Sequence, residues 1–207
     1  MSKEMLHARS HDDLNAETPG MPRIGVWQLL GHSRGRDAIA EAYAWSIATW
    51  CEPEAAPFVP ALGLDYPAFL HLLGSLFPHF SPPEDWLEAQ RQVVGRGGPL
   101  DEFKDLVALL LEHRAVNDES HCRMAHLVAA GCMGSDHLWQ DLGLPRRQAL
   151  SDLFSRYFPA LAAKNSGDMK WKKFLYRLLC ERDGYIACSR PSCAGCADYA
   201  KCFGPEE

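Results

Sequence analysis

Four cysteines near the end of the chain have the spacing of a metal-binding loop. They follow the pattern Cys-x4-Cys-x2-Cys-x5-Cys and are Cys188, Cys193, Cys196 and Cys202. Thiolate sulfur is a soft ligand that suits zinc, copper(I) and iron–sulfur clusters. A free cysteine usually prefers burial among apolar neighbours, whereas these four share one short polar segment. The pattern therefore predicts that the four thiolates hold a metal ion or a cluster.

The spacing of the first three cysteines favours an iron–sulfur-type cluster. Cys-x4-Cys-x2-Cys is the loop spacing of plant-type ferredoxins, whose fourth ligand comes from elsewhere in the chain. Zinc sites more often present two Cys-x2-Cys knuckles, and this chain has one such pair near its end. Small neighbours such as Ser189, Ser192 and Gly195 allow backbone N–H groups to approach the sulfurs. Zinc and a redox-active dithiol remain alternative interpretations.

The sequence indicates a metal-ligand role less strongly for the remaining cysteines. Cys122 and His126 are spaced to share one helix face, which permits chelation, but two ligands do not complete a site. Cys132 and Cys180 fall on apolar helical patterns, so each is interpreted either as a core residue or as an additional thiol near the metal. Cys51 has no partner nearby in the sequence and is interpreted as structural.

The elements that position these residues are predicted to be helices. Apolar residues repeat at intervals of three and four, and no β alternation is present. Ser81 has capping-box spacing for a helix around Trp86, Pro145 suits a first helical position, and Asp168 suits a cap. The expected helices cover residues 36–50, 66–77, the region around 86, 101–111, 120–133, 145–161 and 168–179. We therefore expect an all-α single domain that ends in a cysteine-rich cluster-binding loop, residues 188–202.

Domain organisation and charge narrow the possible functions. Residues 1–24 are expected to form a flexible tail and residues 25–207 a single helical domain. The net charge of −6 argues against a nucleic-acid binder, although residues 168–207 carry seven basic and six acidic side chains. No apolar stretch suits a membrane span or a secretory signal, so no membrane partner and a cytoplasmic location are expected.

Three stretches of the chain resemble the NifQ family of nitrogen fixation. They are CMGSDHLWQDLGLPRRQALSDLF from Cys132, FPALAAKNSGDMKWKKFLYRLLC from Phe158, and the terminal motif CSRPSCAGCADYAKCFG from Cys188. The terminal cysteine motif is the family signature and is complete here. The helices before Cys132 resemble the family more loosely.

The resemblance implies a role in making the iron–molybdenum cofactor of nitrogenase. Proteins of this family are understood to bind a molybdenum–iron–sulfur cluster, with molybdate as the molybdenum source. They pass molybdenum to the NifEN scaffold and the nitrogenase iron protein NifH. The resemblance thus implies a carrier and donor that is not an enzyme in the strict sense. Spacing alone leaves two rivals, a zinc-stabilised helical interaction module and an iron–sulfur electron-transfer protein.

The resemblance also raises interest in His137 and in a group of basic residues. His137 lies in the family-like stretch and is a candidate metal ligand, or else a helix-start residue that hydrogen-bonds the backbone. Lys170, Lys172, Lys173 and Arg177 form either a solvated helix face or a surface that attracts molybdate or an acidic partner. If the cluster must release molybdenum, three cysteines should fix iron while the molybdenum corner is held more weakly, and Cys202 is the expected exception.

Overall fold

Helices form all the regular secondary structure in the part of the chain that the structure describes. The computed structural model describes residues 24–33, 38–52, 59–93, 101–182, 184 and 199–203. The elements are α1 (Val26–Gly31), α2 (Ala38–Trp50), the short turn η1 (Pro60–Gly63), α3 (Tyr66–Leu76), α4 (Glu84–Val93), α5 (Asp101–Glu112), α6 (Glu119–Cys132), α7 (Leu138–Asp141), α8 (Arg147–Tyr157), α9 (Pro159–Lys164), α10 (Trp171–Arg182) and α11 (Tyr199–Phe203). The prediction of an all-α fold is confirmed.

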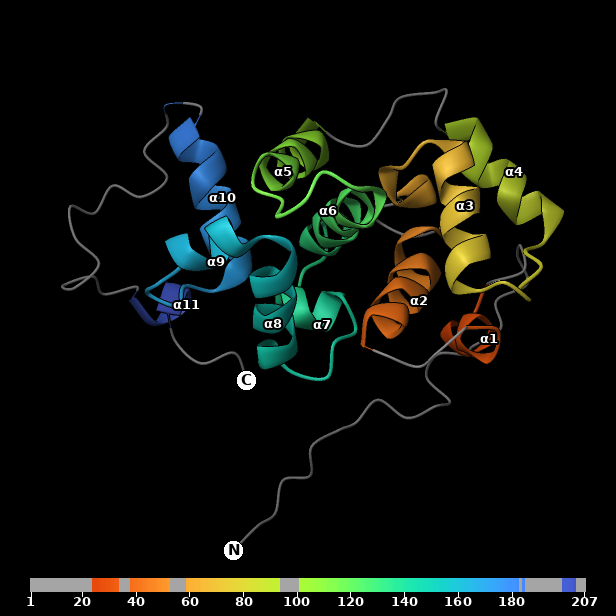
Figure 1. Cartoon of the computed structure of the whole chain (residues 1–207), viewed down its shortest axis with the longest axis horizontal. Coiled ribbons are helices and arrows are strands. Elements are labelled where there is room, and N and C mark those ends of the chain that lie inside the picture. Colours follow the sequence, from red (N-terminus) through yellow and green to blue (C-terminus); the bar gives the residue numbers. More distant parts are fainter. Residues whose placement is uncertain are drawn as a thin grey trace, which may run out of the picture.

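Helix α6 is the central element of the bundle. It packs against α2, α5, α7 and η1. In Figure 1 it lies in the middle of the molecule, with α1–α4 on one side and α8–α11 on the other. Its second half is buried on every side, from Leu127 to Cys132, as expected of a helix enclosed by other helices. Small residues here permit close packing, because a Cβ atom on Gly131 would come within 2.8 Å of Leu142.

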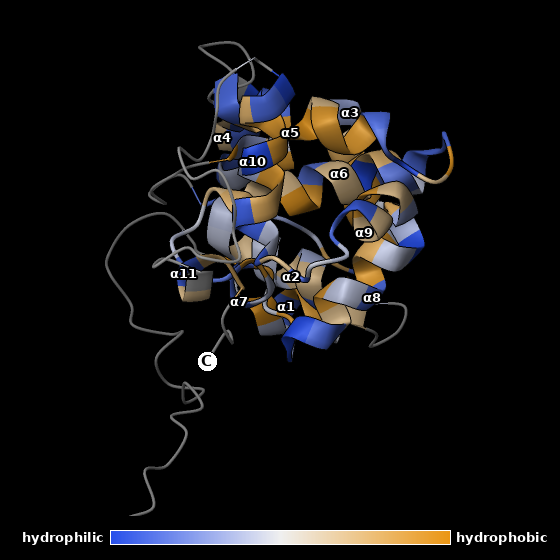
Figure 2. Ribbon diagram, turned by 90° about the vertical axis from the view of Figure 1, so that its left-hand side faces the viewer, coloured by the Kyte–Doolittle hydropathy of each residue, from blue (hydrophilic) through white to orange (hydrophobic). Residues whose placement is uncertain are grey.

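The core continues from α6 into the C-terminal helices through aromatic contacts. The rings of Phe154 on α8 and Trp171 on α10 are stacked, with centroids 3.8 Å apart. Phe174 meets Trp171 edge-on at 5.8 Å. Figure 2 shows the consequence for the helices, whose apolar residues gather on the inner faces while polar residues face outward. These contacts fix the start of α10 against α8.

Most apolar residues of the predicted helices are buried, whereas Ile39, Leu111 and Leu178 are only partly buried. Tyr43, Ile47 and Trp50 of α2 are buried, as is the stripe of α6 that begins at Met124. The stripe predicted between residues 150 and 161 is also buried, but it spans two helices, because Pro159 starts α9. Pro lacks an N–H group and therefore begins a new helix more readily than it continues one.

Three predicted helix starts are wrong. Helix α4 begins at Glu84, three residues after Ser81, because each of two consecutive prolines disfavours helical backbone in the residue before it. Pro145 precedes the N-cap of α8, which is Arg146. Asp168 does not cap α10: it has a left-handed φ of 53°, and its carboxylate accepts hydrogen bonds from Arg147 at 2.6 and 2.8 Å.

An unusual left-handed turn joins the N-terminal helices to α6. Ala61, Leu62 and Gly63 have φ values of 51°, 52° and 70°, and Ala61 and Leu62 are fully buried. The Gln90 amide accepts a hydrogen bond from the Ala61 N–H at 2.8 Å and donates one to the Cys51 carbonyl at 2.7 Å. His126 donates to the Leu62 carbonyl at 3.1 Å. Hydrogen bonds from α4 and α6 therefore hold the strained turn.

Two further expectations concern the chain as a whole. The predicted tail, residues 1–24, lies outside the described residues except for Ile24. The Ile24 side chain is buried, and its N–H donates to the Glu52 carboxylate at 3.1 Å. None of the helices in the described ranges is long and apolar enough to cross a membrane.

Candidate metal-cluster site

The structure describes one of the four predicted cysteine ligands. Cys188, Cys193 and Cys196 lie outside the described residues, while Cys202 is on the short helix α11. Its carbonyl oxygen accepts a hydrogen bond from the Lys170 N–H at 2.7 Å. Cys202 and Phe203 are partly buried against the main core. The C-terminal end of the cysteine motif is therefore fixed to the start of α10.

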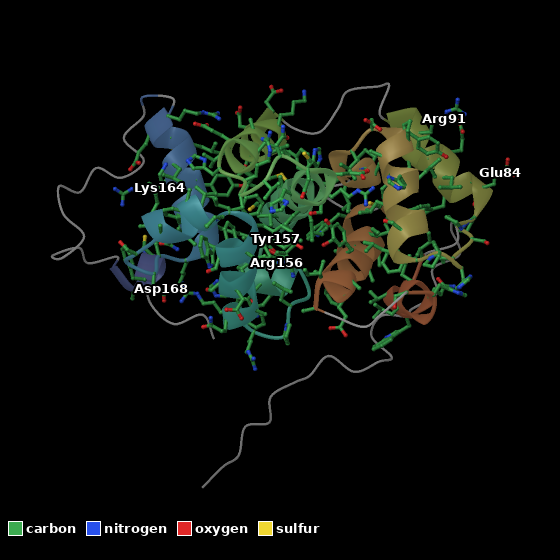
Figure 3. The ribbon with its side chains drawn as sticks, in the orientation of Figure 1. Glu84, Arg91, Arg156, Tyr157, Lys164 and Asp168 are labelled. Atoms are coloured by element: carbon green, nitrogen blue, oxygen red, sulfur yellow. The ribbon has the colours of Figure 1, made fainter. Side chains whose placement is uncertain are left out.

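The turn before α10, which is hydrogen-bonded to α11, is held in place by side-chain hydrogen bonds. Asn165 is buried, and its side-chain amide makes two hydrogen bonds to the backbone of Met169, both at 2.9 Å. Arg147 on α8 binds the Asp168 carboxylate and the Asp168 carbonyl oxygen. Figure 3 shows Asp168 beside α11. This network holds the backbone of Lys170 in place and so supports the hydrogen bond to Cys202.

A pocket of about 410 Å³ lies beside this junction. It is bordered by the segment before and within α7, by the first turn of α10 and by α11. Its lining includes four lysines, a histidine and one carboxylate. These residues and their neighbours in the wall are Ser135, Asp136, His137, Leu138, Gln140, Lys170, Lys172, Lys173 and Lys201. The fold thus brings His137 and three of the four predicted basic residues to one place next to Cys202; Arg177 is not in the lining.

One of the four lysines has a structural role. The Lys172 ammonium forms an ion pair with Asp141, and it donates a hydrogen bond to the Gly134 carbonyl at 2.8 Å. Asp141 is only 9% exposed and also accepts from the Asp136 N–H at 3.1 Å. Gly134 makes room for this carboxylate, since a Cβ atom there would lie 2.4 Å from the Asp141 carboxyl carbon. The pair therefore links α7 to α10 behind the pocket.

His137 occupies the position that the helix-start interpretation describes. It is the N-cap residue of α7, with extended backbone, and its N–H donates to the Gln140 side chain at 3.2 Å. Its side chain is partly exposed and borders the pocket. The location is compatible with the helix-start interpretation and leaves the imidazole accessible to a ligand.

Two of the remaining cysteines are core residues. Cys51 and Cys132 are buried, and burial raises the pKa of each thiol to about 12. A cysteine binds metal as the thiolate, so this burial disfavours a ligand role for both residues. The core interpretation of Cys132 and the structural interpretation of Cys51 are consistent with this burial. Cys180 is partly exposed on α10.

The spacing of Cys122 and His126 has a structural explanation. His126 is largely buried, which lowers the pKa of its imidazole, and its ring packs against Phe103. Its Nδ1–H group donates to the Leu62 carbonyl and supports the left-handed turn. Among the residues that the structure describes, no three His, Cys, Asp or Glu side chains form a group suited to a metal ion.

Sequence reasoning missed part of the site. Asp141 and Gly134 were not identified as partners of Lys172, and Lys201 was not among the basic residues singled out. One available signal was the charge of the first turn of α10, where Lys172 and Lys173 stand without an acidic residue. A helix start normally favours acidic residues, so two lysines there are an exception that indicates a local function.

The comparisons with known proteins agree on one family. The family model described as NifQ matches residues 42–204. The chain is 39% identical to Protein NifQ of Azotobacter vinelandii, over 70% of this chain and 78% of that protein. It is 32% identical to Protein NifQ of Rhodobacter capsulatus, over 75% of this chain and 83% of that protein. It is 34% identical to Protein NifQ of Klebsiella pneumoniae, over 58% of this chain and 83% of that protein.

No solved structure matches the chain. The family model covers the central helix α6, the pocket and the whole cysteine motif. On these grounds the chain belongs to the NifQ family.

Proposed function

We propose that the chain binds a molybdenum–iron–sulfur cluster through Cys188, Cys193, Cys196 and Cys202 and donates its molybdenum to iron–molybdenum cofactor assembly. The observation that carries the proposal is the ferredoxin-like cysteine spacing in a chain of the NifQ family. Thiolates bind iron strongly and molybdenum in its reduced, sulfur-bound form. The cluster is cargo that the protein holds and gives up, with molybdate as the source of the metal.

The surroundings of Cys202 suit an anionic cargo. Thiolate-ligated clusters carry negative charge, and the C-terminal end of the motif lies beside the lysine-lined pocket. Lys170 contributes a backbone N–H to this junction as well as its side chain to the pocket. The donor set and its electrostatic environment therefore fit the proposed cargo.

We assign the protein to carriers and donors of metal and not to enzymes. Receivers of the molybdenum are the NifEN scaffold and the nitrogenase iron protein NifH. Release requires that one cluster corner be held more weakly than the others, so we expect three cysteines to fix iron and Cys202 or His137 to face the molybdenum corner. Hard oxygen ligands and a single imidazole hold molybdenum less firmly than four soft thiolates would.

The proposal is tested by analysing metal and sulfide content. The protein is purified without oxygen from cells that express the nitrogenase genes, and iron, molybdenum, zinc and acid-labile sulfide are quantified per chain. We expect iron and sulfide in near-equal amounts, with molybdenum below one equivalent. Cys188→Ala and Cys193→Ala should lose all three, whereas Cys180→Ala, which removes a partly exposed thiol outside the motif, should retain them.

Two outcomes contradict the proposal. One zinc per chain without sulfide would indicate a zinc-stabilised helical module, and iron and sulfide with a reversible redox couple but no molybdenum would indicate electron transfer. The weak-corner hypothesis is tested separately with Cys202→Ala and His137→Ala. Both should lose molybdenum in preference to iron. Equal loss of both metals from every variant would show that no corner of the cluster holds its metal more weakly than the others.

A further inference from the structure

The lysine-lined pocket contains basic side chains that are not paired within the described part of the protein. Lys172 is neutralised by the buried Asp141. The remaining basic residues in the lining are Lys170, Lys173 and Lys201, and Asp136 is the only carboxylate among the lining residues. Among the described lining residues, basic side chains therefore outnumber acidic ones. Within the described part of the chain, the side chains of Lys170 and Lys173 have no hydrogen-bond or ion-pair partner.

Backbone electrostatics add to this surplus. Helix α10 begins at Trp171 and runs for 12 residues, and its N-terminal end carries a partial positive charge from unpaired N–H groups. Lys170 precedes this end, and Lys172 and Lys173 lie in the first turn, which contains no acidic residue of its own; Asp141 on α7 pairs only with Lys172. Like charges concentrated at a helix start destabilise it unless an anion is bound. An anionic ligand bound at this position would therefore stabilise the start of α10.

The polar groups of the pocket suit an acceptor-only ligand. A lysine ammonium offers three donors and no acceptor, and Ser135 and His137 add a hydroxyl and an imidazole. Three lysines that converge from two separate helices can contact a tetrahedral ion from several directions. The volume of about 410 Å³ exceeds that of one such ion and leaves space for bridging water.

We propose that this pocket binds a tetrahedral oxyanion carrying two negative charges, and that molybdate is the oxyanion. The negative charge of the ion complements the basic lining, and Lys170, Lys173 and Lys201 are its ligands. Lys172 is a positioning residue, since it holds α7 and α10 together. The assignment to molybdate rests on the proposed function. Oxyanion binding itself rests only on the charge and shape of the pocket.

The test measures molybdate binding to a full-length chain that cannot assemble the cluster. Cys188, Cys193 and Cys196 are replaced by alanine so that binding to thiolates does not contribute. Equilibrium dialysis against molybdate, with molybdenum quantified on both sides, then gives the affinity and the stoichiometry. We expect about one molybdate per chain and displacement by tungstate, which has the same charge and shape, but weaker displacement by the smaller sulfate ion.

The pocket residues are tested with a charge-matched pair of variants. In the cysteine-replaced chain, Lys170→Ala with Lys173→Ala should weaken binding at least about tenfold, because two charge-assisted hydrogen bonds are lost. Arg91→Ala with Lys104→Ala removes the same charge from exposed sites outside the pocket lining and should change the affinity less than about twofold. Circular dichroism of each variant establishes that the helices are retained.

Each contrary result has a separate meaning. Equal affinity in the pocket variant and the control would overturn the oxyanion site. Equal displacement by sulfate would overturn the assignment to molybdate. If the native chain contains zinc and no sulfide while the pocket still binds molybdate, the proposed cluster function fails and the oxyanion site stands. If the cluster is present but dialysis detects no molybdate, the cluster function stands and the oxyanion site fails.

Discussion

The thiols of Cys51 and Cys132 are enclosed by the core, and this determines their protonation. Desolvation of the charged form raises the pKa of both thiols to about 12, well above the usual value for cysteine. The Cys132 carbonyl is near the Tyr176 hydroxyl, which donates to it at 3.4 Å. At neutral pH the folded protein therefore holds both residues as thiols, separate from the chemistry of the terminal motif.

Alkaline pH should destabilise the protein partly through Cys132. Between about pH 9 and 12 the unfolded chain loses the thiol proton while the folded chain keeps it, so the free energy of unfolding falls as pH rises. Urea unfolding at several pH values should show a shallower decline for Cys132→Ala, by up to about 1.4 kcal/mol per pH unit. Equal slopes for variant and wild type would show that Cys132 ionises in the folded state.

The absence of a Cβ atom at Gly134 leaves the space that the Asp141 carboxylate occupies. A Cβ there would come within 2.4–2.6 Å of the Asp141 carboxylate, which is held from behind by Lys172. Gly134→Ala should therefore destabilise the protein by about 1–3 kcal/mol in urea unfolding, through overpacking. In contrast, a Cβ on Gly74 within α3 meets nothing within 4 Å. Gly74→Ala should stabilise by about 0.5–1 kcal/mol, the helix-propensity gain.

At the scale of elements, the ion pair of Asp141 and Lys172 connects two helices that otherwise share few contacts. Helix α7 has four residues and packs mainly on α6 and α8, while α10 packs on α5. Asp141 and Lys172 have side chains only 9% and 17% exposed. A pair so far removed from water is costly to break from one side, because the other charge stays buried without a partner.

Replacing one partner of the ion pair should therefore destabilise the protein more than replacing both. Lys172→Met should lower the free energy of unfolding by about 3–5 kcal/mol, since it leaves the Asp141 carboxylate unpaired. The double variant Asp141→Leu with Lys172→Met should recover most of that loss. Chemical unfolding of both variants measures the difference. If the double variant is as unstable as the single one, lost packing and not the orphaned charge is responsible.

Long helices were predicted from the sequence more accurately than their boundaries. The stripes of α2, α6 and α10 follow from periodicity, because periodicity reports which face is buried. Caps depend on backbone conformations that tertiary contacts select. The helix predicted over 120–133 begins at Glu119 instead, because the N-cap residue Asp118 accepts a hydrogen bond from the His121 N–H at 2.9 Å. The short helices α7 and α11 are too brief for any periodic signal.

At the scale of the whole molecule, the helical body has a complete core of its own. Its largest buried side chains belong to the helices between α1 and α10, and the terminal motif contributes only the partly buried Cys202 and Phe203. Figure 1 shows α11 at the edge of the molecule, and a backbone hydrogen bond joins it to the start of α10. The described fold therefore does not depend on a metal in the way that a small zinc domain does.

Loss of the cargo should leave this body folded. Cys188→Ala with Cys193→Ala should retain the helical circular dichroism spectrum and a cooperative thermal transition. Its midpoint should lie within a few degrees of the wild type, since about 1 kcal/mol corresponds to roughly 2–4 °C for a chain of this length. A variant without helical signal would indicate instead that metal binding and folding are coupled.

The pocket could not have been located from the sequence alone. His137 and Lys173 are far apart along the chain, and Lys201 follows a segment of cysteines whose course no pattern specified. Residue types indicated the basic character of residues 170–173, but their convergence with His137 depends on how α7 packs against α10. The four cysteines proposed as cluster ligands could be singled out from the sequence alone, because all four occur within one short segment.

The left-handed turn at Ala61–Gly63 also has a consequence for the order of folding. Its backbone costs roughly 1–2 kcal/mol for each residue other than glycine, and the compensating groups are remote. Gln90 lies 29 residues from Ala61, and His126 lies 64 residues from Leu62. Until α4 and α6 are packed, nothing offsets the strain, so the turn should close after the folding transition state.

Gln90→Ala should consequently change the rate of unfolding but not the rate of folding. In stopped-flow experiments it should speed unfolding and leave the folding rate nearly unchanged, because an interaction absent from the transition state affects only the unfolding limb. A proportional slowing of folding would instead place the turn in the nucleus. If the turn forms late, its stability would set the unfolding rate of the helical domain. It would then also set how long the protein can retain the proposed cluster.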